Sequence, residues 1–130
     1  MSKKIGILTS GGDCAGLNAV IRAATFRAVN KYGWKVIGIK DGTLGLVKNP
    51  LDVIDLKPKD FDGHLMRMGG TFLGSNNKSH PFKGINKSQT KLNIESQVIK
   101  GFKELSLDAL IGIGGDGSMK ILKSLTKKGN

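Results

Sequence analysis

Hydrophobic residues along the chain fall into short runs and helical faces that alternate with one another. Residues 1–10 contain an almost unbroken apolar run, as in a strand that is buried on both faces. Residues 17–32 carry apolar side chains at helical spacing and are followed by Gly33, a residue type that commonly ends helices. Residues 35–39 form a second apolar run before a predicted turn at Asp41-Gly42. This order of strand, helix and strand predicts a right-handed βαβ unit.

The middle of the chain is less regular. Residues 43–59 are largely apolar but are interrupted at Asn49-Pro50 and Lys57-Pro58, which favours a loop that can include one short strand. Residues 59–68 place their apolar side chains on one side and predict a single helical segment. Residues 69–81 are mostly small and polar, and they predict an extended loop with functional potential.

The last third of the chain returns to a regular pattern. We expect a helix over residues 89–105, a strand over residues 109–113 and a further helix over residues 119–128. The alternation of strands and helices predicts an α/β fold with a mostly parallel sheet. We expect residues 1–130 to form a Rossmann-like three-layer sandwich.

Two of the predicted strands end in loops of similar composition. Gly11-Gly12-Asp13 follows the first strand, and Gly114-Gly115-Asp116-Gly117-Ser118 follows the strand over residues 109–113. Glycines let a ligand approach the backbone amides, and open α/β sheets bind ligands beyond the carboxyl ends of their strands. A helix is predicted after each loop, and helix N-termini favour anions. The two loops therefore predict a shared site for a phosphorylated ligand.

Each loop resembles a common phosphate-binding motif in its glycines but departs from that motif at another position. Residues 11–18 space their glycines much as a P-loop does, but Leu17-Asn18 stands where that motif needs Lys followed by Ser or Thr. Residues 112–117 fit the pattern G-x-G-x-x-G, but Asp116 lies inside that loop, where its carboxylate would repel a bare pyrophosphate. Such a carboxylate suits Mg²⁺, which prefers oxygen ligands and joins a protein to phosphate oxygens.

Composition narrows the classes of function. A length of 130 residues with 38% hydrophobic content suits one small soluble domain, and no apolar run approaches the length of a membrane span. The net charge of +11 comes mostly from dispersed lysines without interleaved aromatic residues, which favours small phosphorylated ligands over nucleic acid. A single cysteine, Cys14, excludes an internal disulfide, and no secretion signal opens the sequence, so we expect a cytoplasmic protein.

Three segments of the sequence, in their order and spacing, closely resemble the phosphofructokinase family. The segments are Gly11-Gly12-Asp13 with Gly16-Leu17-Asn18, the run Gly-Gly-Thr-Phe-Leu-Gly-Ser over residues 69–75, and Gly114-Gly115-Asp116-Gly117-Ser118. The resemblance covers the whole chain. It implies an ATP-dependent 6-phosphofructokinase activity, which transfers the γ-phosphate of ATP to fructose 6-phosphate in glycolysis. It also implies that residues 1–130 are the nucleotide-binding N-terminal part, with the catalytic loop and a second domain lying beyond Asn130.

The resemblance further implies roles for single residues. Gly12, beside Gly11, would lie against the transferable phosphates, and Lys78 and Ser79 would stand where the family has an arginine that reaches the nucleotide. Gly115, Asp116, Gly117 and Ser118 would hold ATP, with Asp116 taking Mg²⁺. Lysine keeps the charge of the family's arginine but loses its planar fork. Arg22 is the one counterpart of the family's effector-site arginines. The base for the sugar hydroxyl would lie beyond Asn130, so no catalytic residue is expected within this chain.

The resemblance also bears on the phosphoryl donor and on assembly. Gly117 leaves room for the α-phosphate of ATP, whereas relatives that use pyrophosphate tend to carry an aspartate there. The complete enzyme would form a homo-oligomer, a tetramer in this family. Two alternatives stay open from the residues alone. One is a Rossmann-like module that binds NAD or another nucleotide without kinase activity, with Asp41 contacting a ribose. The other is a piece that folds poorly and binds nothing.

Overall fold

A computed structural model of the chain describes five stretches, namely residues 2–10, 16–74, 87–114, 122–123 and 126–127, with the backbone alone for residues 87–95. Four strands form one sheet in the order β3-β2-β1-β4. The strands are β1 (Lys4–Ser10), β2 (Lys35–Ile39), β3 (Val53–Leu56) and β4 (Ala109–Gly114).

The sheet is mostly parallel, as predicted. Strand β1 lies in the middle and pairs in parallel with β2 on one side and with β4 on the other. Strand β3 pairs antiparallel with the far side of β2. Buried residues dominate β1 and β2, in agreement with the apolar runs that predicted them. Strand β4 has exposed and half-buried positions, because it lies at an edge of the sheet.

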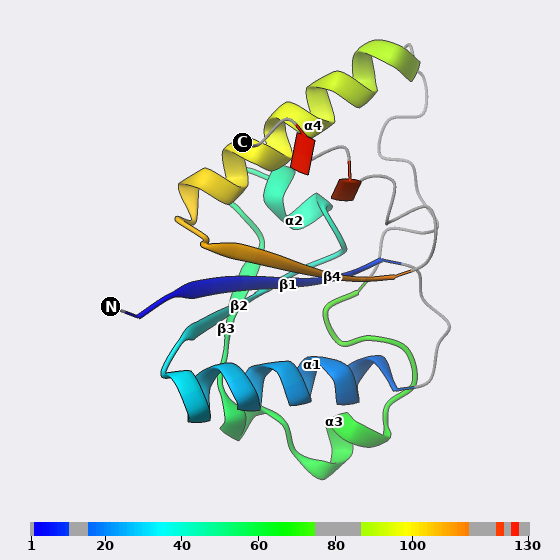
Figure 1. Cartoon of the computed structure of the whole chain (residues 1–130). Coiled ribbons are helices and arrows are strands. Elements are labelled where there is room, and N and C mark those ends of the chain that lie inside the picture. Colours follow the sequence, from blue (N-terminus) through cyan, green and yellow to red (C-terminus); the bar gives the residue numbers. More distant parts are fainter. Residues whose placement is uncertain (1, 11–15, 75–86, 115–121, 124–125, 128–130) are drawn as a thin grey trace.

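Helices cover both faces of the sheet and give three layers (Figure 1). Helices α1 (Leu17–Phe26) and α3 (Gly63–Arg67) lie on one face, and α2 (Leu44–Val47) and α4 (Lys87–Glu104) lie on the other. Two apolar clusters match this division. One is centred on Ile7, Ile21 and Leu73, and the other on Leu8, Ile39 and Leu46. Burying these side chains on each face is the main force that holds the layers together.

Several predicted elements are confirmed with small changes at their ends. The helix expected over residues 17–32 comprises α1 and a π-helical turn, η1 (Arg27–Lys31), that continues it. Gly33 follows with a φ of 64°, as expected of a helix stop. The predicted strands and the helix over residues 89–105 correspond to β1, β2, β4 and α4.

The prediction of one continuous helix over residues 59–68 is wrong. The chain forms a 3₁₀ turn, η2 (Pro58–Asp60), and then α3 as a separate helix. Phe61 lies between them with a φ of −100° and a ψ of 81°, and its side chain is buried in the cluster on the α1 face. Asp62 then caps α3, because its Oδ1 accepts a hydrogen bond of 2.8 Å from the Leu65 amide. Burial of one aromatic side chain and a new cap therefore divide the segment.

The loop predicted over residues 43–59 contains more structure than expected, since it includes α2 as well as β3. The helix expected over residues 119–128 lies mostly outside the described residues, although residues 122–123 and 126–127 are helical. Within the described ranges, no helix is both long enough and apolar enough to cross a bilayer.

Candidate functional site

The carboxyl ends of β1 and β4 lie side by side. The two strands pair in register from Ile5 and Ala109 to Ser10 and Gly114, so both strands end at the same level of the sheet. The Gly11-Gly12-Asp13 loop leaves the end of β1, and the loop that contains Asp116 leaves the end of β4. The similar composition of these loops predicted a shared site, and the register brings their starting points together.

This register is fixed at the opposite end of the two strands. The Lys4 amide donates a hydrogen bond of 2.8 Å to Asp108 Oδ2, and the Asp108 amide donates one of 2.7 Å to the Lys4 carbonyl. Lys4 Nζ also donates to the Leu105 carbonyl at 3.0 Å. The two bonds between Lys4 and Asp108 join residues 104 positions apart in the sequence, and the bond to Leu105 spans 101 positions. A slip of one residue would break them and would turn every side chain of β4 to the other face.

Most of the predicted site residues lie outside the described residues. These are Gly11, Gly12, Lys78, Ser79, Gly115, Asp116, Gly117 and Ser118. Their roles stay predictions, while the strand ends from which both loops start are described. Arg22, the predicted effector residue, lies on the exposed side of α1 with its guanidinium carbon 4.2 Å from the centroid of the Phe26 ring.

Residues 69–74 pack against the end of β1. Thr9 Oγ1 lies 2.9 Å from Thr71 Oγ1 and donates a hydrogen bond of 2.9 Å to the Gly74 carbonyl. Thr9 is fully buried, so these contacts hold the segment at the place where β1 leaves the sheet. The chain then continues into the predicted loop that contains Lys78 and Ser79. Residues 69–74, which belong to one of the three segments of the family resemblance, therefore lie at the same edge of the sheet from which the two glycine loops start.

Asn18 ties the same segment to helix α1. Its side-chain amide nitrogen donates to the carbonyls of Leu65 and Met68 at 3.2 and 3.4 Å. Its Oδ1 accepts a hydrogen bond of 2.9 Å from the Phe72 amide. Asn18 is only 2% exposed, and it lies in the first turn of α1. One buried amide thus fixes α3 and residues 69–74 relative to the start of α1.

A turn after β2 completes this edge of the sheet. The Asp41 amide donates a hydrogen bond of 2.7 Å to the Leu73 carbonyl, and Lys40 Nζ donates one of 3.2 Å to the Phe72 carbonyl. Gly74 has a φ of 80°, and a Cβ at this position would collide with Asp41 Oδ1. Asp41 itself has a φ of 56°, and its carboxylate lies 3.7 Å from Lys48 Nζ. In the alternative NAD-binding module, Asp41 would contact a ribose. In this structure its carboxylate instead contacts a lysine of the protein.

The start of α1 suits an anion. Gly16 precedes the helix with a φ of 96°, and the first turn of α1 contains no acidic residue. The partial positive charge of the helix N-terminus is therefore not neutralised by a carboxylate of that turn. Among the residues that the structure describes, no three His, Cys, Asp or Glu side chains cluster as a metal site would require.

Thr9 was not predicted as a positioning residue, and Asn18 had a place in the resemblance but no predicted role. Both are polar side chains at positions that the hydrophobic pattern assigns to the interior, Thr9 at the end of a buried strand and Asn18 beside Leu17. Buried polar side chains need hydrogen-bond partners, so this pattern is the signal that identifies them. Their partners come from distant segments and could not be read from the sequence.

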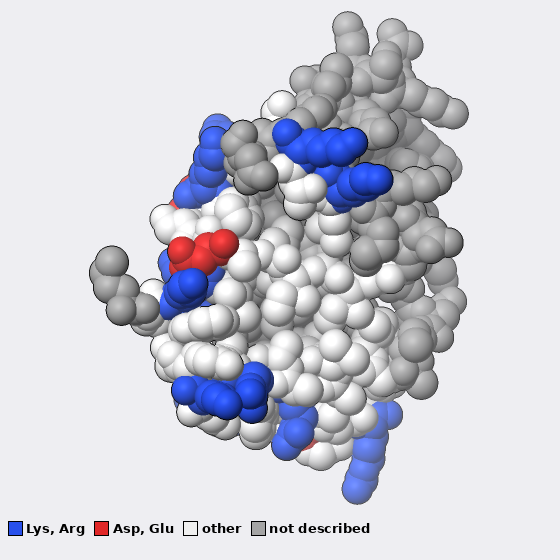
Figure 2. Space-filling view, viewed as in Figure 1, with Lys and Arg blue, Asp and Glu red and all other residues white. Residues whose placement is uncertain are grey.

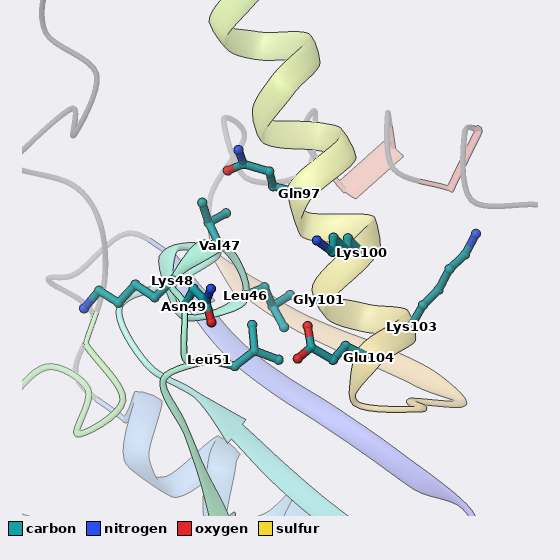
Figure 3. Close-up of a pocket in the computed structure, with 10 residues that line it drawn as sticks. All are labelled: Leu46, Val47, Lys48, Asn49, Leu51, Gln97, Lys100, Gly101, Lys103 and Glu104. Carbon is teal, nitrogen blue, oxygen red and sulfur yellow. The ribbon is translucent and has the colours of Figure 1, made fainter.

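The structure also contains a cavity of about 650 Å³ between α2 and α4 (Figure 3). A Cβ at Gly101 would collide with the Leu46 carbonyl, so this glycine allows α4 to approach α2 closely. Lys48 and Lys103 at the rim extend away from the cavity. Within the described ranges, the residues that line it come from α2, the turn that follows α2, and α4.

Comparison with known proteins gives the same family that the motifs indicate. A family model described as Phosphofructokinase matches residues 4–130. ATP-dependent 6-phosphofructokinase 1 of Synechocystis sp. is 53% identical over 127 residues, which cover 98% of this chain and 35% of that protein. ATP-dependent 6-phosphofructokinase 1 of Nostoc sp. is 50% identical over 128 residues, with 98% and 35% covered.

Solved structures agree at the level of three-dimensional shape. Phosphofructokinase of Pichia pastoris in the T-state superposes with a TM-score of 0.78 at 31% identity, over 98% of this chain and 14% of that chain. Phosphofructokinase of Saccharomyces cerevisiae gives a TM-score of 0.79 at 28% identity, over 98% and 16%. The present chain spans about a third of the length of the bacterial relatives. The match over residues 4–130, together with the register of β1 and β4 and the segments held at their ends, shows that the chain belongs to the phosphofructokinase family.

Proposed function

We propose that this chain is the nucleotide-binding N-terminal part of an ATP-dependent 6-phosphofructokinase. The complete protein would transfer the γ-phosphate of ATP to fructose 6-phosphate and yield fructose 1,6-bisphosphate. The observation that carries the proposal is the pairing of Ser10 with Gly114, which makes the two glycine loops leave the sheet next to each other. The names of the relatives support the choice of donor and acceptor.

Each loop would contribute differently to binding. Glycine amides of Gly11 and Gly12 would face the transferable phosphates, and Gly115 to Ser118 would lie along the nucleotide. Asp116 would supply a carboxylate oxygen for Mg²⁺, which would neutralise charge on the phosphates when it is bound. Amides and cations that are already in place stabilise the charge that develops in a loose phosphoryl-transfer transition state.

The described residues would act as supports for this site. Thr9 and Asn18 hold residues 69–74 at the end of β1, from where the chain leads to Lys78 and Ser79. A lysine at position 78 would meet the nucleotide with one point charge, where an arginine would offer a planar fork. Displacement of this segment by about 1 Å would be enough to lower the rate markedly, because phosphoryl transfer depends on alignment.

The chain alone is expected to bind MgATP without phosphorylating fructose 6-phosphate. The family's base for the sugar hydroxyl has no counterpart in the motifs of these 130 residues. General-base help is worth roughly 10² to 10⁴ in rate, and positioning of the acceptor adds more. The complete protein would act in the cytoplasm as a homo-oligomer, in keeping with a glycolytic enzyme.

Calorimetric titration of the purified chain tests the nucleotide site. MgATP should bind, NAD should not, and Asp116→Asn should weaken MgATP binding at least about tenfold, the loss expected when one charged ligand of the metal is removed. Asp55→Asn, a matched change on β3, should leave MgATP binding within about twofold of the parent chain. Binding of NAD in preference to MgATP, or equal losses in both variants, would contradict the proposal.

A second experiment tests the choice of phosphoryl donor. In the complete protein, Gly117→Asp should suppress the reaction with ATP, because a carboxylate about 4 Å from a phosphate oxygen costs on the order of several kcal/mol at an effective dielectric near 20. Steady-state assays with ATP and with pyrophosphate would measure the change. A parent enzyme that prefers pyrophosphate, or a variant that retains its ATP reaction, would show that this interpretation of Gly117 is wrong.

A further inference from the structure

The amino end of the sheet carries a cluster of aromatic and basic side chains, in which Trp34 is half-buried and the others are exposed. Tyr32 and Trp34 stack with their ring centroids 4.8 Å apart and an interplanar angle of 24°. Tyr32 follows η1 and Trp34 precedes β2, so the stack lies where the helical segment turns into the sheet. Tyr32 is 49% exposed. The cluster, called the aromatic-basic patch below, comprises Lys3, Arg27, Lys31, Tyr32 and Trp34.

Three cations lie over the two rings. Lys3 Nζ is 5.8 Å from the Trp34 ring centroid, and the guanidinium carbon of Arg27 is 5.8 Å from that of Tyr32. Lys31 Nζ lies 5.9 Å from the Tyr32 ring centroid. All three basic side chains are exposed, and none has an ion-pair partner within the part of the chain that the structure describes. Figure 2 shows basic side chains at this end of the α1 layer. The described residues thus leave the positive charge of the patch uncompensated.

The backbone holds the patch in one arrangement. The Lys35 amide donates a hydrogen bond of 2.9 Å to the Lys3 carbonyl, which places Lys3 beside Trp34. Ser2 Oγ donates one of 2.9 Å to the Gly33 carbonyl. The amides of Gly33 and Trp34 donate to carbonyls of the preceding helical segment, each at 3.0 Å. A partner would therefore meet side chains that are already positioned, which reduces the entropy lost on binding.

We propose that the aromatic-basic patch binds an acidic, carboxylate-rich segment of a partner protein. Tryptophan, tyrosine and arginine are the residue types that contribute most of the binding energy at protein interfaces, and Trp34, Tyr32 and Arg27 lie together here. Carboxylates of the partner would supply the missing negative charge, and the cations held over the rings would stay desolvated on their aromatic side.

The geometry favours a peptide over a nucleic acid. Bases bind to aromatic side chains by stacking on a free ring face. In this patch the two rings stack on each other and three cations lie 5.8 to 5.9 Å from the ring centroids, so the patch offers positive charge more than an open stacking surface. The patch also lies at the amino end of the strands, opposite the loops at the carboxyl end, so a bound partner would leave the proposed nucleotide site accessible. The inference does not depend on that site.

Trp34 provides a direct measurement, because it is the only tryptophan in the sequence. We would titrate the purified chain with a short synthetic peptide of glutamates and interspersed leucines at about 0.15 M salt, where distant charges are screened beyond roughly 8 Å. Binding should give a saturable change in Trp34 emission. Arg27→Gln with Lys31→Gln should weaken binding at least about tenfold, since it removes two of the three local cations.

Matched controls separate the patch from the general charge of the chain. Lys100→Gln with Lys103→Gln removes the same charge from exposed positions on α4 and should change the affinity less than about twofold. Circular dichroism would verify that both double variants fold. Equal losses in the two double variants would overturn the proposal, as would no emission change with the parent chain. Tighter, competing binding of a single-stranded oligonucleotide or of phosphatidylserine vesicles would also overturn it.

Discussion

The carboxyl and amino ends of the sheet are built from different types of residue. At the carboxyl end, glycines and buried polar side chains bring backbone segments within hydrogen-bonding distance, as Gly74, Thr9 and Asn18 show. At the amino end, the aromatic-basic patch adds large side chains to a surface that is already closed by backbone hydrogen bonds. The difference suggests that the carboxyl end tolerates few substitutions, whereas the amino end can change its surface chemistry at little cost in stability.

Gly45→Ala should have the largest effect on stability. A Cβ at this position would lie 2.5 Å from the Asp52 carbonyl oxygen and 2.6 Å from the Lys40 carbonyl oxygen, and these backbone atoms are held by hydrogen bonds. We expect a loss of at least about 3 kcal/mol in the free energy of unfolding, or failure to fold, because overpacking against backbone cannot relax by a change of rotamer. Urea denaturation would measure it.

Gly63→Ala is the matched control for that substitution. A Cβ at Gly63 has open space, and the residue lies at the start of α3. We expect a change between neutral and a gain of about 1 kcal/mol, because alanine restricts the unfolded chain. Equal losses at both glycines would show that close backbone approach is not what distinguishes the carboxyl end.

Asn18→Ala should have the next largest effect. The substitution leaves the Phe72 amide and two carbonyls without their side-chain partner in a buried region, and we expect a loss of about 2–4 kcal/mol. Asn30→Ala, an exposed change on η1, should cost less than about 0.5 kcal/mol. Thermal unfolding of both variants would test the comparison, and a mild Asn18 variant would contradict the role given to this amide.

Thr9→Val should have a moderate effect on stability. The substitution keeps the shape of the side chain but removes the hydroxyl between Thr71 and Gly74, and we expect a cost of about 1–2 kcal/mol. In Thr25→Val, the lost hydroxyl donates only to the carbonyl of Ile21 within α1, so the cost should be smaller. Because Thr9 positions residues 69–74, its variant should also bind MgATP more weakly in calorimetry, whereas the Thr25 variant should not.

Lys31→Gln should have the smallest effect on stability. Lys31 is exposed at the end of η1, where a cation interacts favourably with the helix C-terminus, and we expect a cost of about 0.3–1 kcal/mol. A loss as large as that of the Asn18 variant would remove the distinction between the two ends of the sheet. Urea denaturation at matched ionic strength would measure it, since salt screens this interaction.

The regular elements could be predicted from the sequence because their hydrophobic patterns are long and periodic. The buried strands β1 and β2 and helices α1 and α4 are of this kind. The segment between β2 and α4 could not be predicted in detail, because its structure depends on tertiary contacts. Phe61 divides a helical pattern by entering the core, and the four-residue helix α2 forms where Gly45 packs against the backbone of Lys40 and Asp52. Short helices have little stability of their own, so their sequence signal is weak.

The candidate site was predicted as a pair of loops, and the register of β1 with β4 confirms that the loops start next to each other. The polar supports could not be predicted in the same way. Asn18 contacts residues 47 to 54 positions away, and Thr9 contacts residues 62 and 65 positions away. Such distant partners are set by the whole fold and cannot be identified from nearby residues. The glycines and the carboxylate after a strand lie next to one another in the sequence, so they can.

The pairing of Lys4 with Asp108 has a consequence for how the protein is made. Strand β1 leaves the ribosome before the partner for one of its edges, which is synthesised about a hundred residues later. During translation that edge has unsatisfied backbone groups and is open to contact with other nascent chains. Closing such a distant pair is also slow, because loop entropy is lost before the contact forms. Chaperones that bind extended apolar segments would therefore protect this chain most while residues 11–108 are being synthesised.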